Sequence, residues 1–335
     1  MSAERKLVSI VIPAWNEEAV IPELGRRLAQ VMDAHPQYGF EVIVVDNGSR
    51  DKSFELLHGL HHQDPRFKTV QLSRNFTADG GVAAGLRYAT GHCAVLMDAD
   101  LQDPPECIGQ FLEKWEQGFD VVYGVIRSRE GVSRTRRLGN KLFYKLLNTV
   151  TNVGGTSLPQ NVTAFRLMDR RVYEVLNRMA ETNRFTRGLC AWCGFTQVGI
   201  EFDRAERFAG ETKAPLLDIV KEAIDGIFSF SFIPLKLVTV LGLALSVFSF
   251  LFLAWQLIAS FFMGNAVEGY LTIICTILLM FGFLFLVLGV IGEYLARIFD
   301  EVKARPLYVV KGTVGFPEEF STALDRRLPV HGSNP

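Results

Sequence analysis

The chain has 335 residues, enough for one large domain or two, and its 36 acidic and 35 basic side chains leave a formal net charge of −1. Because acidic and basic residues nearly balance, the composition gives no sign of a surface that binds a polyanion, and no nucleic-acid partner is expected. Hydrophobic residues make up an ordinary 49% of the chain, but they are concentrated in its C-terminal half.

Short apolar runs alternate with amphipathic stretches through the first hundred residues. The runs predict strands at Leu7–Ile12, Phe40–Val45, Lys68–Leu72 and Cys93–Met97. The intervening stretches predict helices over about Glu18–Asp33 and Ser53–His61, and a third that ends near Tyr88. Strand–helix alternation with short links indicates an α/β fold with a parallel, doubly wound sheet.

Polar clusters follow the ends of successive predicted strands. Glu17 comes after the first strand, Asp46 ends the second, and Asp98 and Asp100 follow the fourth. Sheets of this kind bind ligands in a crevice outside the carboxyl ends of their strands. These carboxylates are therefore expected to converge on one crevice.

The most informative stretch is Asp98–Pro105, where a buried strand stops at three carboxylates and an amide. Crowded carboxylates repel one another, so a cation is expected beside them. Oxygen ligands at this density suit Mg²⁺ or Mn²⁺, and Asp98, Asp100 and Gln102 are the predicted ligands. In a regular strand Asp98 and Asp100 would point to one face. The competing interpretation is a solvated acidic loop that caps the strand.

Glycines and arginines supply two weaker signals. Gly80, Gly81 and Gly85 only loosely match a dinucleotide-binding fingerprint, and they do not follow the first strand. A nucleotide held by acids and a metal is therefore the better prediction. Five arginines lie within eleven residues and predict a phosphate-binding lid, with a solvated basic face as the alternative. They are Arg127, Arg129, Arg134, Arg136 and Arg137.

Cysteine spacing points away from a metal or redox centre. Cys190 and Cys193 have the spacing of half a zinc site, but no second pair or histidine cluster accompanies them. They are predicted to be reduced, packed thiols. The polar N-terminus leads directly into a strand, so no signal peptide is expected and the soluble part is predicted to be cytosolic.

The C-terminal half has the pattern of a membrane anchor. Leu216–Phe232 predicts an interfacial amphipathic helix. Leu237–Met263 and Tyr270–Gly292 carry no acidic or basic residue, and each is long enough to span a bilayer. The short turn Gly264–Gly269 lacks Lys and Arg, so it is expected outside, with both chain ends in the cytosol. Leu307–Val310 is expected to be a short strand that docks on a sheet.

The predicted organisation has four parts. Residues 1–213 form the cytosolic catalytic domain and 214–232 the interfacial helix. Residues 233–296 form a two-helix membrane hairpin, and 297–335 a cytosolic tail.

Several motifs together resemble glycosyltransferase family 2, in particular the polyprenyl-phosphate glycosyltransferases such as bactoprenol glucosyltransferases and dolichol-phosphate mannose synthases. The resemblance extends to about Val310. The matching strings are Val11–Glu18, Leu72–Phe76, Asp98–Glu106, Phe165–Arg170, Arg184–Gly188, Asp225–Phe230 and Gly289–Tyr294.

The resemblance implies a Rossmann-like GT-A catalytic domain with two C-terminal spanning helices. It implies transfer of a sugar, with inversion, from a UDP-linked donor to undecaprenyl phosphate or a related lipid at the inner (plasma) membrane. A homotetramer is also implied. One runner-up is an enzyme with another lipid acceptor. The alternative from another class is a weakened or inactive member that binds nucleotide or lipid and regulates a membrane glycosylation partner.

Site roles follow from the matched motifs. Asp98, Asp100 and Gln102 resemble the family's metal and diphosphate set, with Asp100 also assigned a catalytic role. The nucleotide pocket is expected to comprise Pro13, Trp15, Glu17, Asp46, Asn75 and Asp98. Arg127 and Arg129 lie where relatives grip the acceptor phosphate, and they complete the predicted catalytic set.

Three departures from the family pattern fall in the expected crevice. Asn47 stands where the family usually has Asp, Thr77–Asp79 replaces Gly-Lys/His-Glu/Gln, and Ala164 replaces an Asp of close bacterial relatives. A phosphate monoester has a second pKa of about 6, so much of the acceptor is a dianion at neutral pH. It therefore needs little help from a general base, and activity is expected despite Ala164.

Overall fold

A computed structural model of the chain describes residues 5–127, 162–179, 181, 184–204, 238, 240–244, 247–248, 251–252, 255, 258 and 270–317. Two compact units make up the chain. The first comprises Met1–Val220 together with Ala304–Pro335, and the second is Lys221–Lys303. The predicted interfacial helix and Arg129 lie outside the described residues, as does most of the first predicted membrane span.

The described elements of the first unit alternate between strand and helix over its first hundred residues. In chain order they are β1 (Leu7–Ala14), α1 (Ile21–Ala34), β2 (Gly39–Asp46), α2 (Ser53–Gln63), β3 (Phe67–Leu72), α3 (Thr77–Tyr88), β4 (Cys93–Leu96), η1 (Pro105–Cys107), α4 (Ile108–Glu116), β5 (Val121–Ile126), β6 (Val162–Asp169), α6 (Arg170–Arg178), α7 (Thr186–Trp192), β7 (Gln197–Phe202) and β8 (Val310–Val314). The strands and helices predicted for this region are confirmed to within a few residues.

Local chemistry sets the helix ends. α1 begins at Ile21 and not at Glu18, because proline at position 22 suits a first helical turn. The carbonyl of Glu17 accepts the backbone N–H groups of Val20 and Ile21, which closes the preceding turn. α6 starts immediately after Asp169, whose side chain accepts the backbone N–H of Arg171 as an N-cap.

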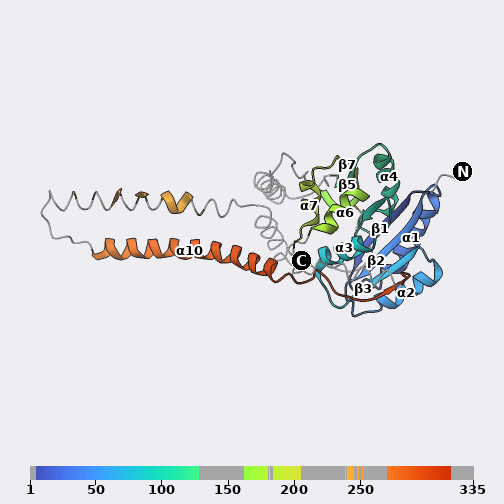
Figure 1. The fold of residues 1–335 in the computed structure, drawn as a ribbon, viewed down its shortest axis with the longest axis horizontal. Coiled ribbons are helices and arrows are strands. Elements are labelled where there is room, and N and C mark those ends of the chain that lie inside the picture. The colour runs from blue at the N-terminus through green and yellow to red at the C-terminus, as the bar shows by residue number, and fades with distance from the viewer. Residues whose placement is uncertain are drawn as a thin grey trace, which may run out of the picture. The chain divides into compact units, whose positions relative to one another are not determined.

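The eight strands form one mixed sheet in the order β7-β5-β6-β4-β1-β2-β3-β8 (Figure 1). β1 to β4 are parallel, as predicted, but β6 is antiparallel to both β4 and β5, and β8 is antiparallel to β3. The prediction of a wholly parallel sheet was therefore wrong. Since β7 runs parallel to β5, the carboxyl ends of six strands and the amino end of β6 share one edge.

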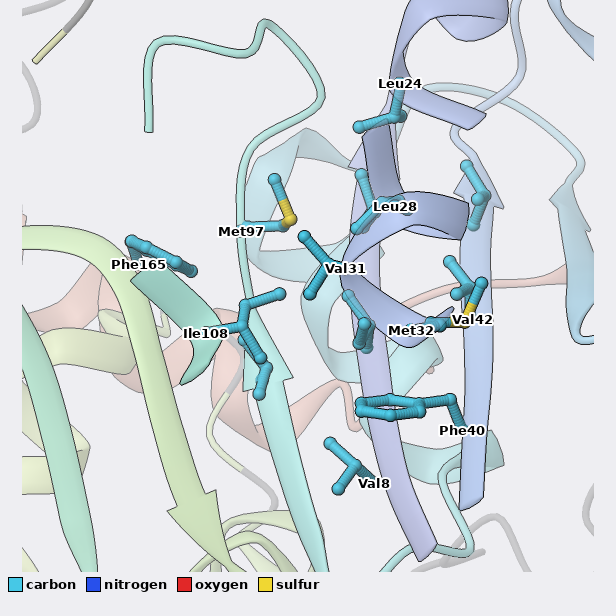
Figure 2. Close-up of a cluster of buried hydrophobic side chains, with 14 of the residues drawn as sticks. Val8, Leu24, Leu28, Val31, Met32, Phe40, Val42, Met97, Ile108 and Phe165 are labelled. Atoms are coloured by element: carbon cyan, nitrogen blue, oxygen red, sulfur yellow. The ribbon is translucent and has the colours of Figure 1, made fainter. Parts of the chain in front are cut away.

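One face of the sheet packs on α1, α2 and α4. Figure 2 shows α1 side chains pointing into this layer toward residues of β1, β2 and the segment after β4. The apolar residues labelled there are Val8, Leu24, Leu28, Val31, Met32, Phe40, Val42, Met97, Ile108 and Phe165. They are all at most 8% exposed, so burial of this layer supplies a large share of the folding free energy.

The other face packs on α3, which approaches β1 very closely. A Cβ on Gly85 would lie 2.3 Å from a Val11 methyl, and one on Gly81 would lie 3.0 Å from Pro13 Cβ. These glycines therefore allow helix and strand to meet, which explains a pattern that only superficially resembles a dinucleotide fingerprint.

The C-terminal tail completes this second layer. It forms β8, which starts three residues later than the predicted strand begins and pairs with β3. Buried Tyr308 joins the cluster of α3 and β3, and Phe316 packs edge-on against Tyr88 at a centroid distance of 5.0 Å. By pairing with β3, the tail leaves that strand without exposed, unpaired backbone groups on its outer side.

The second unit contains α10 (Tyr270–Val302), drawn in orange in Figure 1. Its segment Met280–Val302 is the one stretch, among the described residues, with the length and hydropathy of a membrane span. The helix begins at the predicted residue and extends ten residues past Gly292, the end of the predicted span. The described residues thus support one apolar spanning helix of the two predicted.

Candidate functional site

Every site residue predicted in the described first unit lies on one edge of the sheet. We call it the carboxyl edge, defined by the residues that follow β1 to β5 and β7 and by the start of β6. In the register, Ala14 of β1 pairs with Asp46 of β2, and Val11 pairs with Leu96 of β4. The strand ends that carry these residues therefore lie side by side at one edge, and the single crevice expected there stays a prediction.

The loops after β1 and β2 are joined by hydrogen bonds. The backbone N–H of Asn16 donates to Ser49 Oγ at 3.0 Å, and that of Glu17 donates to Ser53 Oγ at 2.9 Å. In return, the N–H of Arg50 donates to Asn16 Oδ1 at 2.9 Å. These hydrogen bonds fix half-exposed Trp15 and the neighbouring Glu17 beside the end of β2.

Asp46 is fully buried at this junction. Its Oδ1 accepts the backbone N–H of Ser49 at 3.0 Å, whereas Oδ2 has no hydrogen-bond donor in the part of the chain described. A buried carboxylate oxygen without a donor is costly in a folded protein, so a ligand that donates to it is expected.

Left-handed backbone conformations cluster at this edge. One such residue follows each of β1, β2, β3 and β4: Asn16 (φ 54°), Gly48 (φ 68°), Thr77 (φ 69°) and Leu101 (φ 57°). Only Gly48 adopts this region without strain, and the conformation is least favourable for branched Thr77. Strain of this kind concentrates at ligand sites, where the surrounding structure holds it in place.

The acidic segment forms a turn beyond β4, which ends at Leu96. Asp98 and Asp100 therefore do not lie in a regular strand, and the alternation that would point both to one face does not apply to them. Asp100 Oδ1 accepts the backbone N–H of Gln102 at 3.1 Å, and Leu101 takes its left-handed conformation inside that turn. The turn keeps both carboxylates at the carboxyl edge.

Sequence reasoning assigned no separate role to Asp103, the most deeply buried acid of this segment. Burial raises its pKa to about 7, and the nearby charges of Asp98 and Asp100 add to that effect. Arg204, just beyond β7, counters it, with Nε 3.3 Å from Asp103 Oδ1. That contact is an ion pair without hydrogen-bond alignment, so neither oxygen of Asp103 has a good donor within the described residues. The adjacent prolines of the motif were the one available sign of a buried turn.

The charges of Asp98 and Asp100, which act on buried Asp103, would be stabilised by a divalent cation. Among the described residues, no three His, Cys, Asp or Glu side chains are arranged to enclose a metal by themselves. Mg²⁺ characteristically takes one or two carboxylates and completes its shell with substrate phosphates and water. Asp98 and Asp100, with the Gln102 amide, fit that kind of partial shell.

Arg127, at the end of β5, already has anionic neighbours. Its guanidinium lies 3.5 Å from Glu201 of β7 and 3.4 Å from Asp203, the residue that follows β7. All three side chains are more than half exposed, so these ion pairs are weak and can exchange for another anion.

Ala164 lies near the amino end of β6, at the same edge. Arg166, which pairs in register with Leu96, is buried and donates to the backbone carbonyls of Thr163 and Ala164 at 2.9 and 3.2 Å. The guanidinium fixes the backbone at this position, while the side chain of residue 164 offers no carboxylate.

Cys190 and Cys193 are packed thiols, as predicted. Cys190 is buried and Cys193 partly buried, and neither forms a disulfide. Burial raises the pKa of the Cys193 thiol to about 11, which keeps it protonated and unreactive at neutral pH.

Comparison of the sequence with known proteins identifies its family. Residues 9–176 match the model of Glycosyl transferase family 2. The chain is 43% identical to an uncharacterized glycosyltransferase of Bacillus subtilis, over 92% of this chain and 94% of that one. It is 36% identical to the bactoprenol glucosyl transferase of Shigella phage SfII, over 91% of this chain and 97% of that one.

Among solved structures, glucosyl-3-phosphoglycerate synthase from Mycobacterium tuberculosis aligns with a TM-score of 0.46 and 21% identity, over 68% of this chain and 80% of that one. That likeness is too remote to bear on the site. The family model and the two relatives confirm the resemblance read from the motifs: this chain belongs to glycosyltransferase family 2 and is a glycosyltransferase enzyme with an α/β fold of the GT-A kind.

Proposed function

We propose that this enzyme transfers a hexose from a nucleoside-diphosphate sugar to a polyprenyl phosphate, with undecaprenyl phosphate as the expected acceptor. The observation that carries the proposal is the pairing of two facts. A bactoprenol glucosyl transferase matches 91% of the chain, and the carboxyl edge holds a cluster of acids suited to a metal-bound diphosphate. UDP is the expected nucleotide of the donor.

The donor's nucleoside is assigned to the β1–β2 side of the edge. Trp15 offers a half-exposed ring for stacking on a base, and Pro13 and Glu17 flank it. Asp46 Oδ2, which lacks a protein donor in the described structure, is suited to accept a hydrogen bond from the base or ribose. Asn75, after β3, completes this pocket in the proposal.

The diphosphate is assigned to the acidic turn. Asp98, Asp100 and Gln102 would hold one Mg²⁺ or Mn²⁺ ion, which supplies positive charge to the departing nucleoside diphosphate. The turn would hold these ligands in place, because the left-handed Leu101 and the Asp100–Gln102 hydrogen bond fix the shape of the turn. Asp98 can serve both the metal and the nucleotide.

The acceptor is assigned to the β5 side. A phosphate oxygen of the lipid attacks the anomeric carbon as the bond from that carbon to the nucleoside diphosphate breaks, with inversion. The products are a hexosyl polyprenyl phosphate and a nucleoside diphosphate. Arg127 and Arg129 would offset the repulsion between the two anionic substrates. In the described structure Arg127 rests against Glu201 and Asp203, which the lipid phosphate would replace.

Ala164 fits a reaction without a protein base. The acceptor phosphate, with a second pKa of about 6, loses no proton to a side chain when it attacks as a dianion. Stabilisation of the leaving group then supplies most of the catalysis.

A lipid phosphate lies at the membrane surface, because its charge cannot enter hydrocarbon cheaply. We place the catalytic unit and both chain ends on the cytosolic side of the inner membrane, anchored by two spanning helices with α10 as the second. The homotetramer carries over from the family resemblance as part of the same proposal.

A transfer assay tests the proposal. Purified enzyme in detergent is incubated with undecaprenyl phosphate and each of a panel of nucleoside-diphosphate hexoses, with Mn²⁺, Mg²⁺ or EDTA, and the lipid product is identified by mass spectrometry. We expect hexosyl undecaprenyl phosphate with one donor, and none in EDTA. Nucleotide binding without transfer to any lipid phosphate would instead support the regulatory alternative.

A further inference from the structure

Asn47 joins the end of β2 to the segment that follows β3. Its side-chain amide donates to the carbonyl of Thr77 at 2.7 Å, and its Oδ1 accepts the backbone N–H of Phe76 at 2.9 Å. Its own backbone N–H donates to Ala14 at the end of β1. One buried residue therefore ties together the segments that follow three strands.

The two partners decide which way the amide points. A backbone carbonyl can only accept and a backbone N–H can only donate, so nitrogen must face Thr77 and oxygen must face Phe76. A carboxylate in the same place could keep the Phe76 contact. Its other oxygen, however, would face the Thr77 carbonyl as a second acceptor.

Thr77 is held in a conformation that its side chain disfavours. Its φ of 69° is left-handed, which is unusual for a branched residue. Besides the Asn47 contact, its backbone N–H donates to Asn75 Oδ1 at 2.8 Å. The N–H that holds Asn75 belongs to the Phe76–Thr77 peptide, and Asn47 binds the peptide groups on both sides of it. The orientation of the Asn75 carboxamide, which the proposal places in the nucleotide pocket, therefore depends on the backbone that Asn47 fixes.

The surroundings leave this arrangement little freedom. A Cβ on Gly48 would lie 2.6 Å from the Arg74 backbone, and one on Gly81 would lie 3.6 Å from the Asn47 amide nitrogen. On the far side, the backbone N–H of Ser73 donates to Val309, just before β8. The segment Ser73–Thr77 is thus held by β2, α3 and the C-terminal tail.

We propose that Asn47 is a positioning residue for the nucleotide pocket, and that it and Thr77 form a matched pair. The Asn47 amide holds Thr77 in its left-handed conformation, and this fixes the Asn75 carboxamide toward the donor. The inference rests on the proposed function, since it assumes that Asn75 contacts the nucleotide. It also assigns a purpose to two departures from the family pattern, which compensate each other.

The test uses a cycle of variants. In Asn47→Asp the carboxylate repels the Thr77 carbonyl, and we expect the Kd for UDP with Mn²⁺, measured by calorimetry, to rise about tenfold. In Asn47→Asp/Thr77→Gly the peptide can rotate away at no steric cost, so the Kd is expected to return to within about threefold of wild type. Thr77→Gly alone is expected to stay within that same range.

Asn177→Asp is the matched control. Asn177 also donates its amide to a backbone carbonyl, that of Leu86 at the other end of α3. This variant is expected to lower the melting temperature about as much as Asn47→Asp, yet to bind UDP with the wild-type Kd. An equal loss of UDP affinity in Asn177→Asp would show that Asn47 acts only through stability and would overturn the proposal.

A ligand-free measurement separates this inference from the proposed function. Hydrogen exchange of the peptide covering residues 73–79 should accelerate in Asn47→Asp and return toward wild type in the double variant. If the wild type binds neither UDP nor another nucleoside diphosphate but exchange follows this pattern, the donor assignment fails and the Asn47–Thr77 pairing stands. Wild-type exchange in Asn47→Asp, or a double variant no better than the single one, overturns the pairing.

Discussion

The catalytic sheet buries carboxylates at both of its edges, and the two edges treat them differently. At the edge where β1 and β2 begin, which we call the amino edge, Glu41 is 3% exposed and has a donor for each oxygen. Oε1 accepts from Ser9 and Thr90 at 2.6 to 2.8 Å, and Oε2 accepts from Lys68 at 2.8 Å. The network continues through the Ser9 hydroxyl to the N–H of Gly91.

The carboxyl edge leaves its buried acids incompletely satisfied. Asp46 has an oxygen without a donor, and Asp103 has only a misaligned ion pair with Arg204, within the described residues. Four left-handed residues lie at this edge, whereas the amino-edge network contains none. The two edges therefore use buried carboxylates differently. Satisfied acids hold the strands together at the amino edge, whereas the unsatisfied acids of the carboxyl edge are available to a ligand, as we propose.

Asp100→Ala should produce the largest effect on turnover. The substitution removes an anionic ligand of the proposed metal, so kcat/KM for sugar transfer is expected to fall by about a hundredfold or more. The melting temperature should change little, because the lost hydrogen bond to the Gln102 N–H is offset by weaker repulsion of Asp103. Near wild-type turnover by Asp100→Ala in EDTA-treated, metal-free buffer would refute the metal assignment.

Glu41→Gln should have the opposite profile. It leaves Lys68 half-buried without its anionic partner, and we expect a loss of about 2–3 kcal/mol in the free energy of unfolding by urea. The Kd for UDP should stay at the wild-type value. Glu116→Gln is the control, since Glu116 pairs with Lys6 on the surface and its loss should hardly alter stability. Equal stability losses in the two variants would remove the special role of the amino edge.

Asp46→Asn should weaken nucleotide binding without destabilising the protein. The carboxylate becomes an uncharged carboxamide, and the position of Oδ2 is taken by an NH₂ donor or by a neutral oxygen. The Kd for UDP is therefore expected to rise about tenfold or more. Since this oxygen has no donor in the described structure, unfolding by urea should be nearly unchanged. Asp33→Asn, in an exposed ion pair with Arg66, is the control for both readouts. A large stability loss in Asp46→Asn would mean that the oxygen has a structural partner.

The smallest effect concerns acid stability. Burial alone would raise the pKa of Glu41, but the hydrogen bonds from Lys68, Ser9 and Thr90 outweigh it and lower the pKa below its ordinary 4.5. A lowered folded-state pKa contributes stability that is present above pH 4.5 and is lost as the pH falls through the folded value. Urea unfolding at pH 6 and pH 3.5 should therefore show a larger acid loss in the wild type than in Glu41→Gln. Equal acid losses of stability in the wild type and in Glu41→Gln would contradict the lowered pKa of Glu41.

The sequence predicted the carboxyl edge well because its signals are local. Apolar runs ending at Asp46 and Asp98 identify strand ends, and parallel strands bring their ends together. What local signals could not show is long-range pairing. Nothing in the runs around Phe165 indicates that β6 reverses direction, because antiparallel and parallel buried strands have the same composition.

The missed site residues have a similar explanation. Arg204 reaches Asp103 across about a hundred positions of sequence, and the role of Asn47 depends on the φ angle of Thr77. Neither relation leaves a periodic pattern. Asn47 and Thr77 stood out only as departures from a family motif, and the structure shows them in contact.

Ligand-induced stabilisation tests the contrast between the two edges most directly. Thermal unfolding of the wild type, Asp46→Asn and Glu41→Gln would be followed with and without UDP and Mn²⁺ at one fixed concentration. A ligand that binds only the folded state stabilises it, and at a fixed concentration the rise in melting temperature grows with the logarithm of the ligand's affinity. We predict a clear rise for the wild type, a lower baseline with the same rise for Glu41→Gln, and a normal baseline with little rise for Asp46→Asn. A full rise in Asp46→Asn, or a rise lost in Glu41→Gln, would contradict the assignment of ligand binding to the carboxyl edge.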